Sequence, residues 1–179
     1  MGEVTQLLEQ ARQGDSAASE RLFTAVYGEL KALAGRARRA SGPLDTTGLV
    51  HECYLRLGGA PDAKNRGHFF ALAARAMRQI LCDQARRQLA ARRGGGDVPS
   101  DEVDVAPSPA PEVAELVELD GLFTRLANEV DARAAQVMEC RVFGGFTVAE
   151  TAEALEVSER TVHLDFDRAR AWLSQQLAR

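Results

Sequence analysis

The sequence predicts an all-α protein of two small helical domains joined by a flexible acidic linker. Apolar residues recur at helical spacing along most of the chain, and the alternating β-branched runs typical of strands are nearly absent. Residues 97–112 interrupt this pattern with five acidic residues and no basic or aromatic residue. Such a composition cannot bury enough apolar surface to order itself. We therefore expect one domain over residues 1–96, a linker over residues 97–112 and a second domain over residues 113–179.

Three helices are expected in the first domain. The first carries an apolar stripe over residues 22–34 and ends at or before a Gly-Pro pair at residues 42–43. A shorter stripe over residues 49–57 stops before a glycine pair. The longest helix covers residues 68–90 and projects four cations, Arg75, Arg78, Arg86 and Arg87.

This longest helix carries groups that suit unpaired nucleotides. Its arginines offer cations for phosphate, while Gln79 and nearby aromatic rings offer amide and stacking surfaces for bases. The alternative is a solvated basic face with both Phe69 and Phe70 in the core. Phe69 and Phe70 are adjacent and cannot face the same direction, so we expect Phe70 in the core and leave Phe69 open.

The second domain is predicted to end in a helix-turn-helix. Helices are expected from about residue 112 and over residues 133–142, where a glycine pair follows. Thr147 and Glu150 then form a capping box for a short helix. After a three-residue turn, Ser158 caps a longer helix that continues almost to the end of the chain. The alternative to a DNA-binding unit is a helical hairpin that only packs.

The longer of these two helices would enter a major groove with its first turns. The side chains able to reach base edges there are Glu159, Arg160, His163, Leu164 and Asp167 or Arg168. Two features count against strong binding. Glu156 occupies a turn position that often holds glycine because the backbone there favours positive φ. Asp165 and Asp167 add negative charge to a helix that should face phosphates.

The charge of the chain is distributed unevenly. The net charge is −4, but residues 1–96 hold 15 Lys and Arg against 9 Asp and Glu, whereas residues 113–179 hold 7 against 12. We therefore expect the first half to supply most affinity for an anionic partner, and the second half alone to bind duplex DNA weakly.

Several classes of protein are excluded by what the sequence lacks. It has no run of 18 apolar residues and no basic, apolar signal at its start, so we expect a cytoplasmic protein without a membrane partner. A zinc-protease motif beginning at His51 fails because residue 55 is leucine. We expect no catalytic residue, no metal, no cofactor and no enzyme activity. The scattered cysteines indicate reduced, packed thiols, namely Cys53, Cys82 and Cys140.

Three stretches of the chain resemble one family. Residues 48–57 (GLVHECYLRL) resemble the L-V-Q-E-x-F-L-R-L stretch of extracytoplasmic-function (ECF) sigma factors, and residues 78–87 (RQILCDQARR) resemble their R-N-x-x-x-D-x-x-R helix. Residues 68–77 (HFFALAARAM) look like the ECF-like subgroup in particular. The resemblance covers nearly the whole chain outside the linker, with the motifs in the correct order.

The resemblance implies an alternative sigma factor that directs promoter-specific transcription initiation. Binding to the β′ clamp helices of core RNA polymerase would fall to Asp45, Leu49, Val50, Glu52, Tyr54, Leu55 and Arg56. Reading of the minus-ten promoter element would fall to Arg75, Arg78, Gln79, Asp83, Arg86 and Arg87. Reading of the minus-thirty-five element would fall to Ser158, Arg160, Thr161, His163, Leu164 and Arg168.

One departure from the family pattern suggests regulation. Where the family carries D-A-E-D, this chain has Asp45, Thr46, Thr47 and Gly48, so two of three acids are missing. A phosphate on Thr47, or on Thr46 as second choice, would restore negative charge opposite the basic clamp and implies a Ser/Thr protein kinase as partner. The alternative is that one of these threonines is only the N-cap of the following helix.

Two other classes compete with the sigma-factor interpretation. One is a helix-turn-helix regulator that binds duplex DNA without polymerase, but its cations should concentrate in the second half. The other is a protein-interaction module that has lost DNA binding, which the acidic second half favours. Run-off transcription with core polymerase distinguishes all three.

Overall fold

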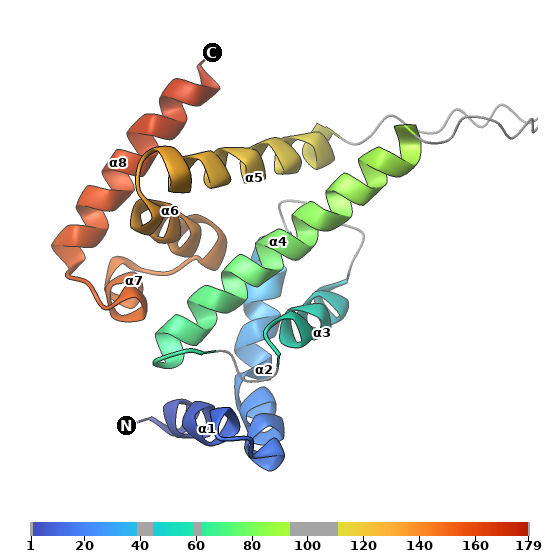
Figure 1. Ribbon diagram of the computed structural model, residues 1–179, viewed down its shortest axis with the longest axis vertical. Coiled ribbons are helices and arrows are strands. Elements are labelled where there is room, and N and C mark those ends of the chain that lie inside the picture. Colours follow the sequence, from blue (N-terminus) through green and yellow to red (C-terminus); the bar gives the residue numbers. More distant parts are fainter. Residues whose placement is uncertain (1, 39–44, 59–61, 94–110, 179) are drawn as a thin grey trace, which may run out of the picture.

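The computed structural model describes residues 2–38, 45–58, 62–93 and 111–178, and every regular element in these ranges is a helix (Figure 1). The all-α prediction is therefore confirmed. The expected Gly-Pro break at residues 42–43 and nearly all of the expected linker, residues 97–112, lie outside the described residues. None of the helices in the described ranges combines the length and apolar character that a membrane crossing requires.

The first half of the chain contributes four helices, α1 (Glu3–Arg12), α2 (Ser16–Arg38), α3 (Thr46–Arg56) and α4 (Arg66–Arg93). The second half contributes α5 (Pro111–Glu129), α6 (Ala132–Glu139), the π-helical turn η1 (Cys140–Gly144), α7 (Val148–Leu155) and α8 (Glu159–Leu177). Gly145 ends the α6–η1 segment in the left-handed conformation, with φ of 67°. Sequence analysis did not predict α1, which buries Leu7, Leu8 and Ala11 and packs on α2.

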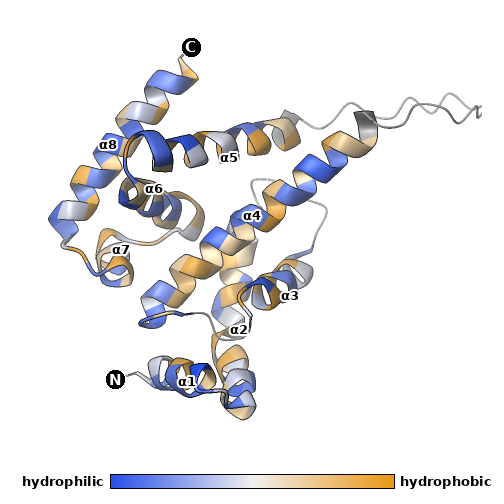
Figure 2. Ribbon diagram, in the orientation of Figure 1, coloured by the Kyte–Doolittle hydropathy of each residue, from blue (hydrophilic) through white to orange (hydrophobic). Residues whose placement is uncertain are grey.

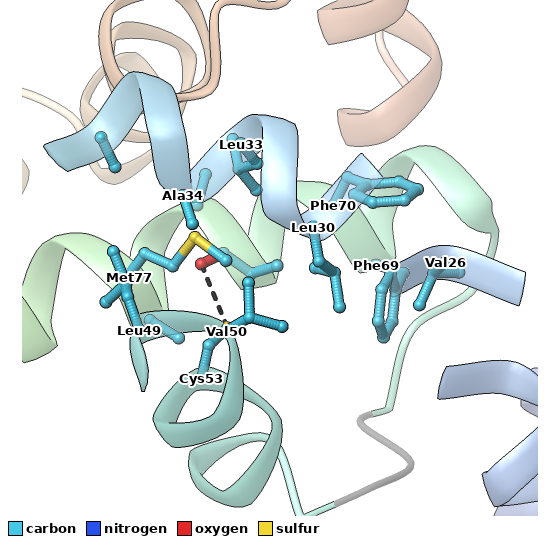
Figure 3. Close-up of a cluster of buried hydrophobic side chains, with 14 of the residues drawn as sticks. Val26, Leu30, Leu33, Ala34, Leu49, Val50, Cys53, Phe69, Phe70 and Met77 are labelled. Carbon is cyan, nitrogen blue, oxygen red and sulfur yellow. Dashed lines mark hydrogen bonds between the residues drawn. The ribbon is translucent and has the colours of Figure 1, made fainter. Parts of the chain in front are cut away.

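The main core lies between α2, α3 and α4 (Figure 3). Leu30 and Leu33 of α2, Leu49 and Val50 of α3, and Met77 of α4 are all almost inaccessible to solvent. The Cys53 thiol is buried there too and donates to the Ala73 carbonyl at 3.6 Å. In Figure 2 the helices are striped rather than uniform in hydropathy, as expected for amphipathic helices that bury one face.

Both adjacent phenylalanines of α4 are buried. Phe70 lies in the core as predicted, but Phe69, which the sequence left open, is the more deeply buried of the two at 1% exposed. Their rings meet edge to face, with centroids 5.3 Å apart. Both can be buried because α4 is covered from two directions. Figure 3 shows Phe69 beside Val26 and Leu30 of α2. Phe70 instead borders a cleft that Phe146 of the second half also lines.

The second half has a core of its own and also packs on the first. Phe123, Leu126, Met138, Phe143 and Ala169 form its main cluster. The helices α5, α7 and η1 all pack against α4. Leu116 is buried within the core of the first half, and three half-buried side chains pack against the same cluster, Val113, Val117 and Phe146. The division into separate domains at residues 97–112 stays a prediction.

Candidate nucleic-acid and polymerase interfaces

The helix-turn-helix geometry is present at the C-terminal end. The Thr147 hydroxyl accepts from the Glu150 backbone at 3.1 Å, and the Glu150 carboxylate accepts from the Thr147 backbone at 2.7 Å. This reciprocal bonding, chiefly the backbone donor of Thr147, lowers the pKa of Glu150. Glu156 adopts the left-handed conformation that its position favours, with φ of 54°. Ser158 then caps α8 by accepting from the Thr161 backbone at 3.1 Å.

The expected reading face of α8 is turned outward. Ser158, Arg160, His163 and Leu164 are exposed on its first turns, with Arg168 one turn later and Thr161 half-buried. The expectation that Asp165 adds negative charge to this face is wrong. Its side chain is buried within the second half, where the Arg133 Nε donates to it at 2.6 Å. Of the two aspartates, only Asp167 adds exposed negative charge to this face.

The start of α3 differs from the expectation that a threonine caps it. Asp45 is the N-cap, and its carboxylate accepts from the Gly48 backbone at 2.6 Å. Thr46 and Thr47 are the first two helical residues, so the alternative role of either threonine as the cap is wrong. The Asp45 carboxylate is favoured as the N-cap because it accepts this hydrogen bond as an anion at the positive end of the helix dipole. Thr47 is exposed, whereas Thr46 is half-buried.

The residues expected to bind polymerase divide between the core and the surface. Leu49 and Val50 are fully buried in the main core. Leu55 is 63% exposed, an unusual degree for a leucine, and Arg56 is exposed beside it. Glu52 and Tyr54 are half-buried, and the Tyr54 hydroxyl donates to the Ser19 carbonyl at 3.3 Å. The exposed members of this set therefore lie at the two ends of α3, with Asp45 at its start and Leu55 and Arg56 in its last turn.

The expected minus-ten row on α4 is only partly exposed. Arg75, Arg86 and Arg87 reach solvent, while Gln79 and Asp83 are half-buried. Arg78, expected to project from the helix, is instead buried. Its Nε donates to Glu139 of α6 at 2.6 Å, its Nη1 pairs with Asp120 of α5, and its guanidinium lies 5.2 Å from the Phe123 ring centroid.

Arg78 belongs to a charge network that joins four helices. Arg86 of α4 pairs with the same Asp120 and, at 3.2 Å, with Asp83. Asp83 also accepts from the Nη2 of Arg56 on α3 at 2.8 Å. A cleft of about 380 Å³ lies over this network, and Arg75 and Gln79 line it as well. All the expected minus-ten residues except Arg87 are thus brought together around one cleft, but against carboxylates of the second half.

A second polar contact joins the helix-turn-helix to the loop before α4. Lys64 Nζ lies 2.6 Å from the Glu156 carboxylate, and the Asn65 amide donates to the Glu153 carbonyl at 3.5 Å. Gly67 approaches α7 so closely that a Cβ on it would lie 3.3 Å from the Ala154 Cβ. Sequence analysis missed this contact, although glutamate in place of the usual glycine at position 156 marked the position as unusual.

The three cysteines of the chain all lie buried in the described ranges. The thiols of Cys53, Cys82 and Cys140 are free and buried, and burial raises the pKa of Cys53 and of Cys140 to about 12. Within the part of the chain that the structure describes, no three His, Cys, Asp or Glu side chains are grouped so that they could hold a metal ion.

The described residues combine a C-terminal helix-turn-helix with an arginine-rich helix, an arrangement typical of nucleic-acid-binding proteins. Comparison with protein families makes this specific: the ECF sigma factor family model matches residues 1–179. The chain belongs to the ECF sigma factor family. Its members are alternative sigma factors, which direct transcription with core RNA polymerase and promoter DNA as partners and are not enzymes. No curated protein matches the sequence.

Proposed function

We propose that this chain is an ECF sigma factor of the ECF-like subgroup that uses three surfaces in initiation. The last turn of α3 docks on the β′ clamp helices, α4 reads the melted minus-ten element, and α8 reads the minus-thirty-five element. The observation that carries the proposal is the outward face of α8, where Arg160, His163 and Leu164 are exposed on a capped recognition helix while Asp165 is turned inward. These are the groups that read base edges and thymine methyls.

Run-off transcription with core polymerase tests the proposal, and two exposed leucines provide a matched pair of variants. Leu55→Ser on α3 should weaken binding to core polymerase and lower transcript yield at least tenfold. Leu177→Ser is the control, because that side chain is equally exposed, 67% against 63%, and lies at the far end of α8. If both variants transcribe like the original protein, α3 is not the docking surface.

Promoter reading by α8 has its own pair of variants. Arg160→Ala removes an exposed cation from the first turn of α8, and Arg170→Ala removes one from the fourth turn, where it pairs with Asp167. Only the first should change which minus-thirty-five sequences support transcription, because a groove accepts the first turns of a recognition helix. An identical sequence preference in both variants would contradict this role of α8.

We further propose that phosphorylation of Thr47 by a Ser/Thr kinase strengthens docking on the β′ clamp. Support comes from the exposure of Thr47 at the second helical position, while Asp45 already serves as the cap. A phosphate there adds a charge of about −1.5 to −2 at the positive end of the helix dipole. Thr47→Glu should therefore raise affinity for a β′ clamp fragment, and half-buried Thr46 gives the control, Thr46→Glu. Tight binding and full transcription by the unmodified protein would refute the switch.

We also propose that residues 1–96 and 113–179 are domains able to fold separately. The second half supports this with its own apolar cluster around Phe123 and Leu126. Expressed alone, each half should melt cooperatively in circular dichroism. A second half that is unfolded alone but helical in the full chain would contradict the division.

A further inference from the structure

Leu164 is an exposed leucine on the outward face of α8. Its side chain is 57% exposed, and it joins none of the hydrophobic clusters formed by the described residues. Its neighbours on this face, Arg160, His163 and Asp167, are polar and exposed. Leu164 is thus a single apolar group among polar ones, which is too small a patch for a protein interface.

The opposite face of α8 holds Leu164 in this outward position. Val162 and Ala169 are buried in apolar clusters of the second half. Between them, the buried Asp165 carboxylate accepts from the Arg133 Nε at 2.6 Å. These contacts fix the rotation of the helix about its own axis, so Leu164 has to face away from the second half.

Arg160 is the arginine of α8 that is available to contact a base. Arg168 lies 3.6 Å from the Asp131 carboxylate, and Arg170 lies 3.2 Å from the Asp167 carboxylate. Among the described residues Arg160 forms no ion pair, and it is exposed in the first turn of the helix. Its guanidinium therefore keeps all its donors for a partner outside the chain.

Arg160 and Leu164 are placed to contact nearby base pairs. They lie four residues apart and so share one ridge of the helix. At about 1.5 Å per residue they are about 6 Å apart along the axis, which is roughly two base pairs at about 3.4 Å each. In the major groove a guanine offers two acceptors to an arginine, and a thymine offers its C5 methyl group to an apolar side chain.

We propose that Arg160 and Leu164 make this chain specific for minus-thirty-five elements in which a guanine and a thymine lie within about two base pairs of each other. Arg160 donates to the guanine O6 and N7, and Leu164 packs on the thymine methyl. This inference rests on the proposed reading of the minus-thirty-five element by α8 and adds which bases are read. Leu164 has no polar atom in its side chain, so it recognises thymine by the methyl group alone.

Uracil lacks only this methyl group and therefore tests the proposal, using the holoenzyme of this chain with core polymerase. Promoters selected from a pool randomised over the minus-thirty-five element should be enriched in a guanine and a thymine at this spacing. Replacing that thymine by uracil should weaken promoter binding about fourfold, the effect of burying one methyl-sized group. Leu164→Ser should lose the uracil effect. Leu177→Ser is the control and should keep it, because that exposed leucine lies at the far end of α8.

A second variant gives a gain rather than a loss. Leu164→Arg should select promoters with guanine at the position where the original protein selects thymine. A selected element without thymine, or the same uracil effect in Leu164→Ser as in the original protein, would overturn the inference and leave the sigma-factor function intact.

Failure of the proposed function would be recognised separately, by an absence of transcription from every promoter in the pool. The uracil comparison then uses the full chain alone, with fluorescence anisotropy of labelled duplexes at about 50 mM salt, where phosphate contacts are strong. A fourfold preference for the thymine duplex that Leu164→Ser abolishes would support the inference. Equal affinity for the thymine and uracil duplexes would overturn it.

Discussion

Removal of the Arg78 side chain should destabilise the protein much more than removal of Arg86, although both lie on α4 and both pair with Asp120. The Arg78 side chain is 7% exposed, whereas that of Arg86 is 47% exposed. Arg78→Ala leaves the Asp120 and Glu139 carboxylates buried without their shared cation, and breaking a buried pair in this way costs about 3 to 5 kcal/mol. Arg86→Ala removes a partly solvated partner, for which about 1 kcal/mol or less is expected.

Urea unfolding followed by circular dichroism measures both free energies of unfolding. A domain of this size is stable by about 5 to 15 kcal/mol, so the Arg78→Ala loss is a large and measurable fraction. The triple variant Arg78→Met/Asp120→Asn/Glu139→Gln should recover most of it, because the loss comes from unpaired charge rather than from missing volume. Equal losses in the two single variants, or no recovery in the triple variant, would refute this account of the network.

Three further predictions concern the reading face of α4, the cap of α7 and the buried thiols. Arg75→Ala should reduce permanganate-detected promoter melting without weakening binding to core polymerase, because Arg75 is exposed and lies outside the core. Thr147→Ala should lower the free energy of unfolding by about 1 kcal/mol through loss of the capping box. The pKa of Glu150 is lowered in the folded protein, so its contribution to the free energy of unfolding is present above the pKa that Glu150 has in the unfolded chain. That contribution is lost as the pH falls through the pKa that Glu150 has in the folded protein. Glu150→Gln should remove this acid dependence. Cys53 and Cys140, with pKa values raised to about 12, should not react with a disulfide reagent at pH 8 until the protein unfolds.

Each of these has a contradicting outcome. Unchanged melting would make Arg75 a solvated side chain only. A stability loss in Thr147→Ser as large as that in Thr147→Ala would mean that the methyl group, not the hydroxyl, matters at the cap. Rapid modification of Cys53 and Cys140 in the folded protein would mean that the core opens frequently.

Local patterns in the sequence predicted local structure well. The capping box at Thr147 and the cap at Ser158 place the helix-turn-helix to within a residue, because each signal and the bond it forms lie within three positions of one another. The helix α1 was not predicted, although Leu7, Leu8 and Ala11 recur at helical spacing and share its buried face.

Long-range partners could not be predicted in the same way. Asp120 and Glu139, whose carboxylates pair with Arg78, lie 42 and 61 positions away from it in the sequence, and no local pattern predicts these pairs. Periodicity places Arg78 on α4 but cannot say that α5 and α6 cover that side of the helix. The position of Phe69 was left open for the same reason, because only a helix packed from two directions buries adjacent residues.

The acidic character of the second half has a structural meaning that its net charge conceals. Asp120 and Glu139 face α4, Glu156 pairs with Lys64, and Asp165 is turned inward onto Arg133. Much of the charge that seemed to oppose DNA binding is therefore directed at partners within the chain, and the reading face of α8 keeps its exposed cations. We still expect the second half alone to have too little net attraction to hold duplex DNA, so that it would read a promoter only when a polymerase-bound first half keeps it at high local concentration.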